Sequence, residues 1–295
     1  MRMALLHAGA GVAVVRLAGM AAGFALTVVL ARVLGPEGVG GYGYAVMLLA
    51  LAAVPVNNGW ATVLLRATAR ARGGRKGQGG TAKWGEVAGL LRWGLRFALG
   101  LTLLLVLGPG VLIFGPSGQG VLGLGALLLL AGVLVFDQLS GLRLAVLRGL
   151  DHPVWGQVPE MLLRPLLILV FFLLLTGLHP DTPQLFDAFL ALVGAAGLSA
   201  LFGGVILWRK SPEILHRAAP ETHLPVWTRS AALLAGNAGL VMLNAQTDFL
   251  MLGLLGTPED LGHYRVAMQV GLLSGFVYTA LNMIAMQRFA HLFAS

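Results

Sequence analysis

Two short stretches, LGPEGVGGY at Leu34–Tyr42 and LGTPEDLGHY at Leu255–Tyr264, spell nearly the same loop twice in one chain. When they are aligned on Gly35 and Gly256, an acid, a glycine, an aromatic residue and an alanine follow in the same order. The aligned pairs are Glu37 with Glu259, Gly40 with Gly262, Tyr42 with Tyr264 and Ala45 with Ala267. One residue is inserted in the second copy, so the offset is 221 before the loop and 222 after it. The repeat predicts one structural unit used twice.

The composition indicates what this unit is made of. Hydrophobic residues make up 57% of the 295 residues and charged residues only 11%, and the mean hydropathy is +0.84. A soluble domain has about 25% charged residues. Apolar runs of about 20 residues, enough to cross a bilayer, recur along the whole chain. We therefore predict an all-α polytopic membrane protein.

The hydropathy pattern predicts about eight transmembrane helices: 10–33, 43–65, 95–114, 120–142, 159–178, 185–208, 231–255 and 265–289. The loops after the even-numbered spans are basic, and those after the odd-numbered spans contain no Lys or Arg. This asymmetry places the N-terminus and the basic loops in the cytoplasm. The net charge of +8 thus orients the chain in the plasma membrane, which argues against nucleic acid as a partner.

The spacing of the two loops also predicts the domain organisation. Six spans separate the copies, an even number, so the two units run in the same direction across the membrane, as in parallel-repeat transporters. We expect a first six-helix bundle over 1–208, a cytoplasmic linker over 209–228, and the first two helices of an incomplete second bundle over 229–295. The remaining helices of that bundle are an expected partner.

Catalysis has little support in the sequence. The chain has no cysteine, which excludes disulfides, thiol chemistry and cysteine-based metal sites. No HExxH, Walker-type or GxSxG motif is present. We expect neither a metal nor a cofactor, and no enzyme activity.

Polar residues within the spans are the candidate site, because charge in hydrocarbon costs several kcal/mol. Arg16 and Thr27 share one face of the first span with Gly23. The offset of 221 carries this face onto a polar stripe of the seventh span, Asn237, Asn244 and Asp248. Asn57 and Asn58 lie beside Pro55 in the second span, where a kink is expected. Other interpretations stay open: Arg16 snorkelling to the headgroups, Asp248 in a structural pair, and Asn57 and Asn58 in a simple packing kink.

Three longer stretches resemble a known family. RLAGMAAGFALTVVLARVLGPEGVGGYGYA (Arg16–Ala45) resembles the opening of the polysaccharide-transport branch, the Wzx-type oligosaccharide flippases, of the multidrug/oligosaccharidyl-lipid/polysaccharide exporter superfamily. VLRGLDHPVWGQVPEMLLRP (Val146–Pro165) resembles its passage between spans four and five, and TDFLMLGLLGTPEDLGHYRVA (Thr247–Ala267) the start of its second half. The resemblance implies two bundles around a central cavity and transport of undecaprenyl-pyrophosphate-linked glycans by alternating access. It also implies that a chain of this length is C-terminally truncated.

Within this resemblance, three cytoplasmic-side arginines become candidates for a pyrophosphate entrance: Arg66, Arg148 and Arg164. A guanidinium group donates two parallel hydrogen bonds to phosphate oxygens. Arg66 and Arg148 are also read as ordinary charges that orient the chain in the membrane. Arg164 lies four residues after Glu160 and is expected to pair with it. The alternatives to a flippase are a cation-coupled multidrug extruder of the same superfamily, a truncated inactive remnant, or a membrane-embedded glycan enzyme.

Overall fold

The structure is a computed structural model that describes residues 2–73, 80–110, 121–178 and 185–271. Within these ranges the secondary structure is helical and contains no strand. The prediction of an all-α polytopic membrane protein is confirmed. Six described helical segments are long and apolar enough to cross a membrane: Gly11–Gly73, Trp84–Gly108, Leu124–Gly149, Pro153–Leu178, Leu185–Lys210 and Leu224–Leu255.

The first of these segments accounts for two of the expected spans. It contains 63 residues, about 95 Å at 1.5 Å per residue, roughly three times the thickness of the hydrocarbon core. Helix α1 (Arg2–Val54) is interrupted at Gly35, whose φ of 70° and ψ of −178° are not helical. This left-handed φ suits glycine, and it separates the first span from the second. Most of the eighth expected span, 265–289, lies outside the described residues.

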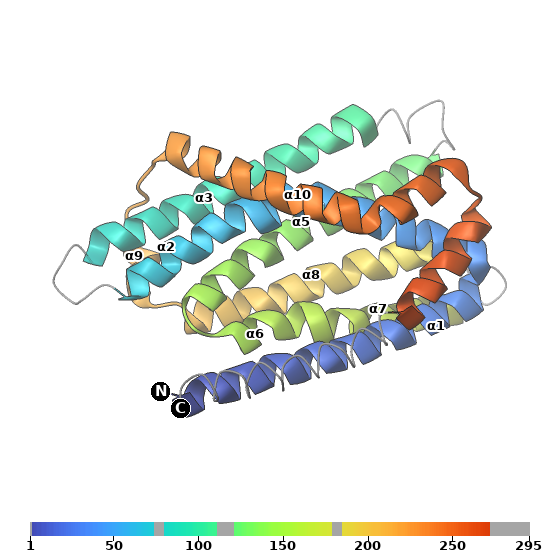
Figure 1. The fold of residues 1–295 in the computed structure, drawn as a ribbon, viewed down its shortest axis with the longest axis horizontal. Helices are drawn as coiled ribbons and strands as arrows, with labels where there is room; N and C mark the ends of the chain where they lie inside the picture. Colours follow the sequence, from blue (N-terminus) through green and yellow to red (C-terminus); the bar gives the residue numbers. More distant parts are fainter. Residues whose placement is uncertain (1, 74–79, 111–120, 179–184, 272–295) are drawn as a thin grey trace, which may run out of the picture.

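Most of the remaining helices lie roughly along the long axis of the molecule (Figure 1). They are η1 (Pro55–Trp60), α2 (Ala61–Gly73), α3 (Gly80–Leu105), η2 (Val106–Gly110), α5 (Val121–Gly149), α6 (Pro153–Val158), η3 (Pro159–Leu163), α7 (Arg164–Leu178), α8 (Leu185–Lys210), α9 (Glu213–Arg217) and α10 (Leu224–Leu255). Helix α3 extends the third expected span toward its N-terminus. Helix α10 crosses the bundle and packs mainly on η1. A further helix over 258–271 follows it.

Two large apolar clusters pack the described helices together, and a smaller one around Phe249 joins α1 to α10 and the helix over 258–271. One large cluster joins η1, α2, α3 and α5 with the start of α10 around Trp60 and Trp227. The other large cluster joins α1, α5, α7 and α8 around the fully buried Phe172. Association of helices in lipid depends on close van der Waals contact, which small residues permit. Gly59 accordingly lies against the backbone of Ala231 and the side chain of Ala235, which brings α10 onto η1.

The two repeated loops lie directly against each other. Gly40 faces the carbonyl of Pro258, and Gly262 faces the carbonyl of Pro36. Pro36 and Pro258 are themselves 222 positions apart, as are Gly40 and Gly262. Each contact therefore has a counterpart in which the equivalent residues of the two loops exchange places. A two-fold relation between the loops requires such a reciprocal pair of contacts. The sequence repeat is therefore matched by a reciprocal contact in space.

The second loop begins its helix with a capping box. Thr257 and Asp260 satisfy each other's backbone N–H groups, at 3.0 Å from the Thr257 N–H and 3.2 Å from the Asp260 N–H. This is the reciprocal N-terminal cap of a helix. The bonds from the hydroxyl and backbone of Thr257 lower the pKa of Asp260 below its ordinary value. The loop thus ends at a defined point, and the helix over 258–271 starts there.

Candidate functional site

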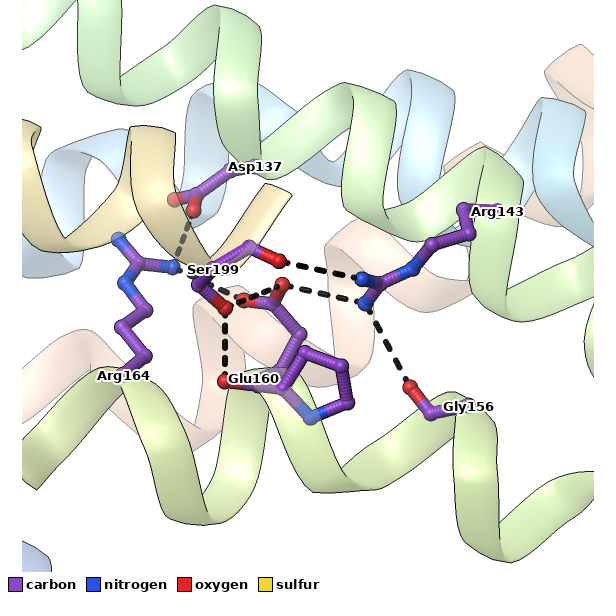
Figure 2. Close-up of polar contacts among 7 residues, drawn as sticks. Asp137, Arg143, Gly156, Glu160, Arg164 and Ser199 are labelled. Carbon is purple, nitrogen blue, oxygen red and sulfur yellow. Dashed lines mark hydrogen bonds and ion pairs between the residues drawn. The ribbon is translucent and has the colours of Figure 1, made fainter. Parts of the chain in front are cut away.

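An ion network joins α5 to η3 and α7, which follow each other within the helical segment Pro153–Leu178 (Figure 2). Glu160 of η3 is its centre. Its carboxylate accepts hydrogen bonds from Arg143 of α5 at 3.2 Å and from Arg164 of α7 at 3.4 Å. Arg164 also forms an ion pair with Asp137 of α5. The four side chains carry two positive and two negative charges, so the network is neutral as a whole.

Arg143 is the most deeply enclosed member of the network. Its side chain is 5% exposed, and it also donates to the carbonyls of Ser199 and Gly156, both at 3.5 Å. A guanidinium group in hydrocarbon is tolerated only where it is paired or meets backbone carbonyls, and Arg143 has both. We conclude that Arg143 has a structural role, tying α5 to α6 and α8.

A wide helical turn positions Glu160. In η3 the N–H of Arg164 bonds to the carbonyl of Pro159, five residues earlier. The hydroxyl of Ser199 on α8 donates to the same carbonyl at 2.7 Å and to the Glu160 carboxylate at 3.3 Å. Pro165 has no N–H to donate to the carbonyl of Met161, four residues earlier. That carbonyl lies against Gly19 of α1. Insertions of this π type are frequent at functional sites.

A cavity of about 450 Å³ opens on one side of this network. We call it the Arg148 cavity. It lies between η1 and α2 on one side and α5 and η3 on the other, with Met242 of α10 at its edge. Its polar lining is Asn57, Asn58, Thr62, Asp137, Ser140, Arg148, Glu160 and Arg164. Four predicted site residues therefore meet in one place, Asn57, Asn58, Arg148 and Arg164.

Two groups in the Arg148 cavity have no partner in the described part of the chain. Arg148 is exposed and forms no ion pair there. The Oδ1 atom of Asn57 is buried, lies against Gly141, and accepts no hydrogen bond there. Buried polar atoms are nearly always bonded, but this oxygen is covered by Gly141 and is closed to a ligand. The cavity thus offers the free guanidinium group of Arg148 to a ligand.

A second cavity of about 390 Å³ lies on the other side of the ion network. We call it the Thr27 cavity. Thr27, another predicted site residue, lines it, and so do Tyr42, Arg265 and Gln269. Asp137 and Arg164 line both cavities. The Arg164–Asp137 pair therefore forms part of the partition between them.

The other predicted site residues lie elsewhere. Arg16 is exposed, and its Nε donates to Gln157 at 3.4 Å; it is close enough to Arg148 for their charges to repel. Arg66 is exposed and lines neither cavity. Asn237, Asn244 and Asp248 are exposed on α10 and line neither cavity. The carboxylate of Asp248 accepts a hydrogen bond from the Tyr264 hydroxyl. Their roles remain predictions.

Several residues of the site were not selected from the sequence. Arg143 lies directly after the expected span 120–142, where a basic residue is ordinary, so no sequence signal set it apart. Asp137 shares a face of its helix with Arg148, yet it pairs with Arg164 instead. Arg265 and Gln269 line the Thr27 cavity because the helix over 258–271 lies beside α1, with Arg265 near Gly43 and Gln269 near Gly23. In the described ranges no three His, Asp or Glu side chains gather as a metal site.

A family model for polysaccharide biosynthesis proteins matches residues 8–287 of the chain. The protein belongs to this family. The match covers nearly the whole sequence, including both repeated loops and every residue of the ion network. No curated protein and no solved structure matches the chain significantly. The membership agrees with the transporter superfamily that the sequence resembles and supports a membrane role in polysaccharide synthesis.

Proposed function

We propose that the protein is a flippase that moves a lipid-linked glycan with a pyrophosphate group across the plasma membrane during polysaccharide biosynthesis. The observation that carries this proposal is the Arg148 cavity, which combines guanidinium groups with amides inside a helical bundle. An anionic group with sugars attached needs both kinds of partner. By resemblance, undecaprenyl pyrophosphate is the carrier, and alternating access between two bundles is the mechanism.

The chemistry of the cavity suits such a headgroup. Arg148 is free to make a paired contact with phosphate oxygens, and Arg16 adds positive charge nearby. The amide of Asn58, which is exposed and lines the same cavity, bonds to a sugar hydroxyl. In a membrane-enclosed cavity these contacts are stronger than in water, since the effective dielectric constant is lower.

The expected orientation assigns each cavity to one half of the membrane. The positive-inside rule puts the inner ends of the second and fourth spans, and with them Asn58 and Arg148, in the cytoplasmic half. Thr27 and Tyr42 then belong to the outer half. A substrate made in the cytoplasm would enter the Arg148 cavity and leave past the Thr27 cavity. This order agrees with export.

The charges favour a flippase over a cation-coupled drug extruder. An extruder needs a carboxylate that is free to bind a cation or proton. The carboxylates that line the two cavities are Asp137 and Glu160, and both are paired with arginines. The unpaired charges of the two cavities in the described structure are arginines.

The proposal is tested with the full chain in proteoliposomes that contain a fluorescent polyprenyl-pyrophosphate oligosaccharide. A membrane-impermeant quencher reports how much of the label lies in the outer leaflet. We expect the protein to move the label between leaflets faster than empty liposomes and faster than liposomes with a polyprenol that lacks the pyrophosphate. Equal rates with and without protein would refute the function.

A further inference from the structure

Arg164 lies where the two cavities meet. It lines the Arg148 cavity and the Thr27 cavity, whereas Arg148 lines only the first and Arg265 only the second. The three arginines therefore follow one another from one cavity to the next. Neither Arg148 nor Arg265 forms an ion pair in the described structure.

The guanidinium group of Arg164 bonds to carboxylates through one nitrogen, and its opposite edge makes no hydrogen bond in the described structure. Both of its carboxylate contacts, to Asp137 and to Glu160, go through the same atom, Nη1. A guanidinium group has five N–H donors in a planar fork. Nε and Nη2 of Arg164 form no hydrogen bond with any described residue, and neither is a fully buried unpaired atom. Two donor atoms thus remain for a ligand.

The two carboxylates prepare this free edge. They hold Nη1 from α5 and η3, so the plane of the guanidinium group is fixed before a ligand arrives. A binding group whose geometry is set by second partners binds more tightly because less freedom is lost. The carboxylates also neutralise Arg164, which allows a charged side chain at this depth.

We infer that Arg164 is an anion-binding residue that serves both cavities, so that a phosphate group passes from Arg148 through Arg164 to Arg265 without losing guanidinium contact. This inference rests on the proposed function and names the residues that guide its anionic group. The ligand chemistry is a phosphate or pyrophosphate with two oxygens directed at the Nε–Nη2 edge. Asp137 and Glu160 are positioning residues in this scheme.

The test uses single-cysteine reporters in the full chain, which has no native cysteine. Thr62→Cys reports on the Arg148 cavity and Val46→Cys on the Thr27 cavity, since each residue lines only that cavity. Inorganic pyrophosphate is added to both sides of proteoliposomes, and the rate of labelling by a small charged thiol reagent is measured. We expect pyrophosphate to slow labelling at both reporters.

The variants separate a shared residue from a local one. Arg164→Gln should raise the pyrophosphate concentration for half-protection about tenfold or more at both reporters, the loss expected for charged hydrogen bonds. Arg148→Gln should raise it only at Thr62→Cys. Arg164→Lys keeps the charge balance with Asp137 and Glu160 but lacks the fork, so it should fold normally and still lose protection in both cavities. A loss confined to one cavity, or none, would overturn the inference.

Two further arms identify the source of the anion and keep this test apart from the flippase test. Protection by a polyprenyl pyrophosphate in the bilayer, at concentrations where inorganic pyrophosphate gives none, assigns the site to a lipid headgroup; the reverse assigns it to a free anion. Protection through Arg164 without glycan movement would leave the inference standing and refute the flippase. Glycan movement together with undiminished protection in Arg164→Lys would support the flippase and refute the role of Arg164.

Discussion

Gly203 of α8 lies directly against the guanidinium group of Arg143 on α5. A Cβ atom at this position would occupy the space of Nη1, so only glycine admits the arginine. The next residue, Gly204, has no atom within 4 Å of an added Cβ. The geometry of the ion network therefore depends on one glycine and not on its neighbour.

Gly203→Ala should destabilise the protein by displacing Arg143 from Glu160 and from the carbonyls of Ser199 and Gly156. We expect a loss of about 1–3 kcal/mol, the cost of leaving buried polar groups unpaired. Gly204→Ala is the matched control and should be nearly neutral. Thermal unfolding in detergent measures both, and equal melting temperatures for the two variants would show that Arg143 is not held there.

Glu160→Gln should be more damaging, because it leaves Arg143 buried without a carboxylate. Removing one partner of a buried pair costs roughly 3–5 kcal/mol. Replacing Arg143 by Met in the same protein removes the uncompensated charge and should restore part of the stability. The double-mutant cycle gives the coupling energy; additive effects would mean that the two residues do not interact.

The sequence was sufficient for the fold class, since the apolar runs and the Gly35 and Gly256 loops determine it. It also selected Asn57 and Asn58, because polar groups within spans need a reason to be there, while the family resemblance selected Arg148 and Arg164. It could not show how these groups pair. Asp137 and Arg164 are 27 positions apart, and their contact depends on how α5 and α7 pack, which no local pattern encodes.

The contact between the repeated loops predicts a second pair of sensitive glycines. Gly40→Ala and Gly262→Ala each place a methyl group against the backbone of the other loop, an overpacking that costs about 1–3 kcal/mol. Gly236→Ala on α10, with open space around it, is the control. Labelling of Leu261→Cys, which is buried at this contact, should become faster in the first two variants; unchanged labelling would contradict the packing.

Single cysteines can test the orientation that gives the cavities their sides. Glu37 and Glu259 occupy equivalent, exposed positions of the two repeated loops, and Glu213 is exposed in α9. Cysteine at the first two should react with an impermeant reagent from outside intact cells, and cysteine at Glu213 only after permeabilisation. Labelling of Glu37→Cys and Glu213→Cys from the same side would end the assignment.

The polar stripe on α10 does not have the same surroundings as the face of α1 to which the repeat relates it. The offset of 221 pairs Thr27 with Asp248 in the sequence, yet Thr27 lines a cavity while Asp248 is exposed. Equivalent positions in a repeat face equivalent surroundings only when both units have the same neighbours. In the described structure, α10 packs on η1 through Ala231 and Ala235, and its polar face points away from that contact.

The central claim is that the Arg148 cavity binds the anionic group of a substrate that is then transported. The most direct measurement is the initial rate of movement of polyprenyl-pyrophosphate oligosaccharide between leaflets for Arg148→Gln and Arg66→Gln, at equal protein content. Both variants remove one cytoplasmic-side arginine, but only Arg148 lines the cavity. We predict that Arg148→Gln lowers the rate about tenfold, as loss of a charged hydrogen bond implies, and that Arg66→Gln leaves it unchanged. Equal rates for the two variants would contradict the claim.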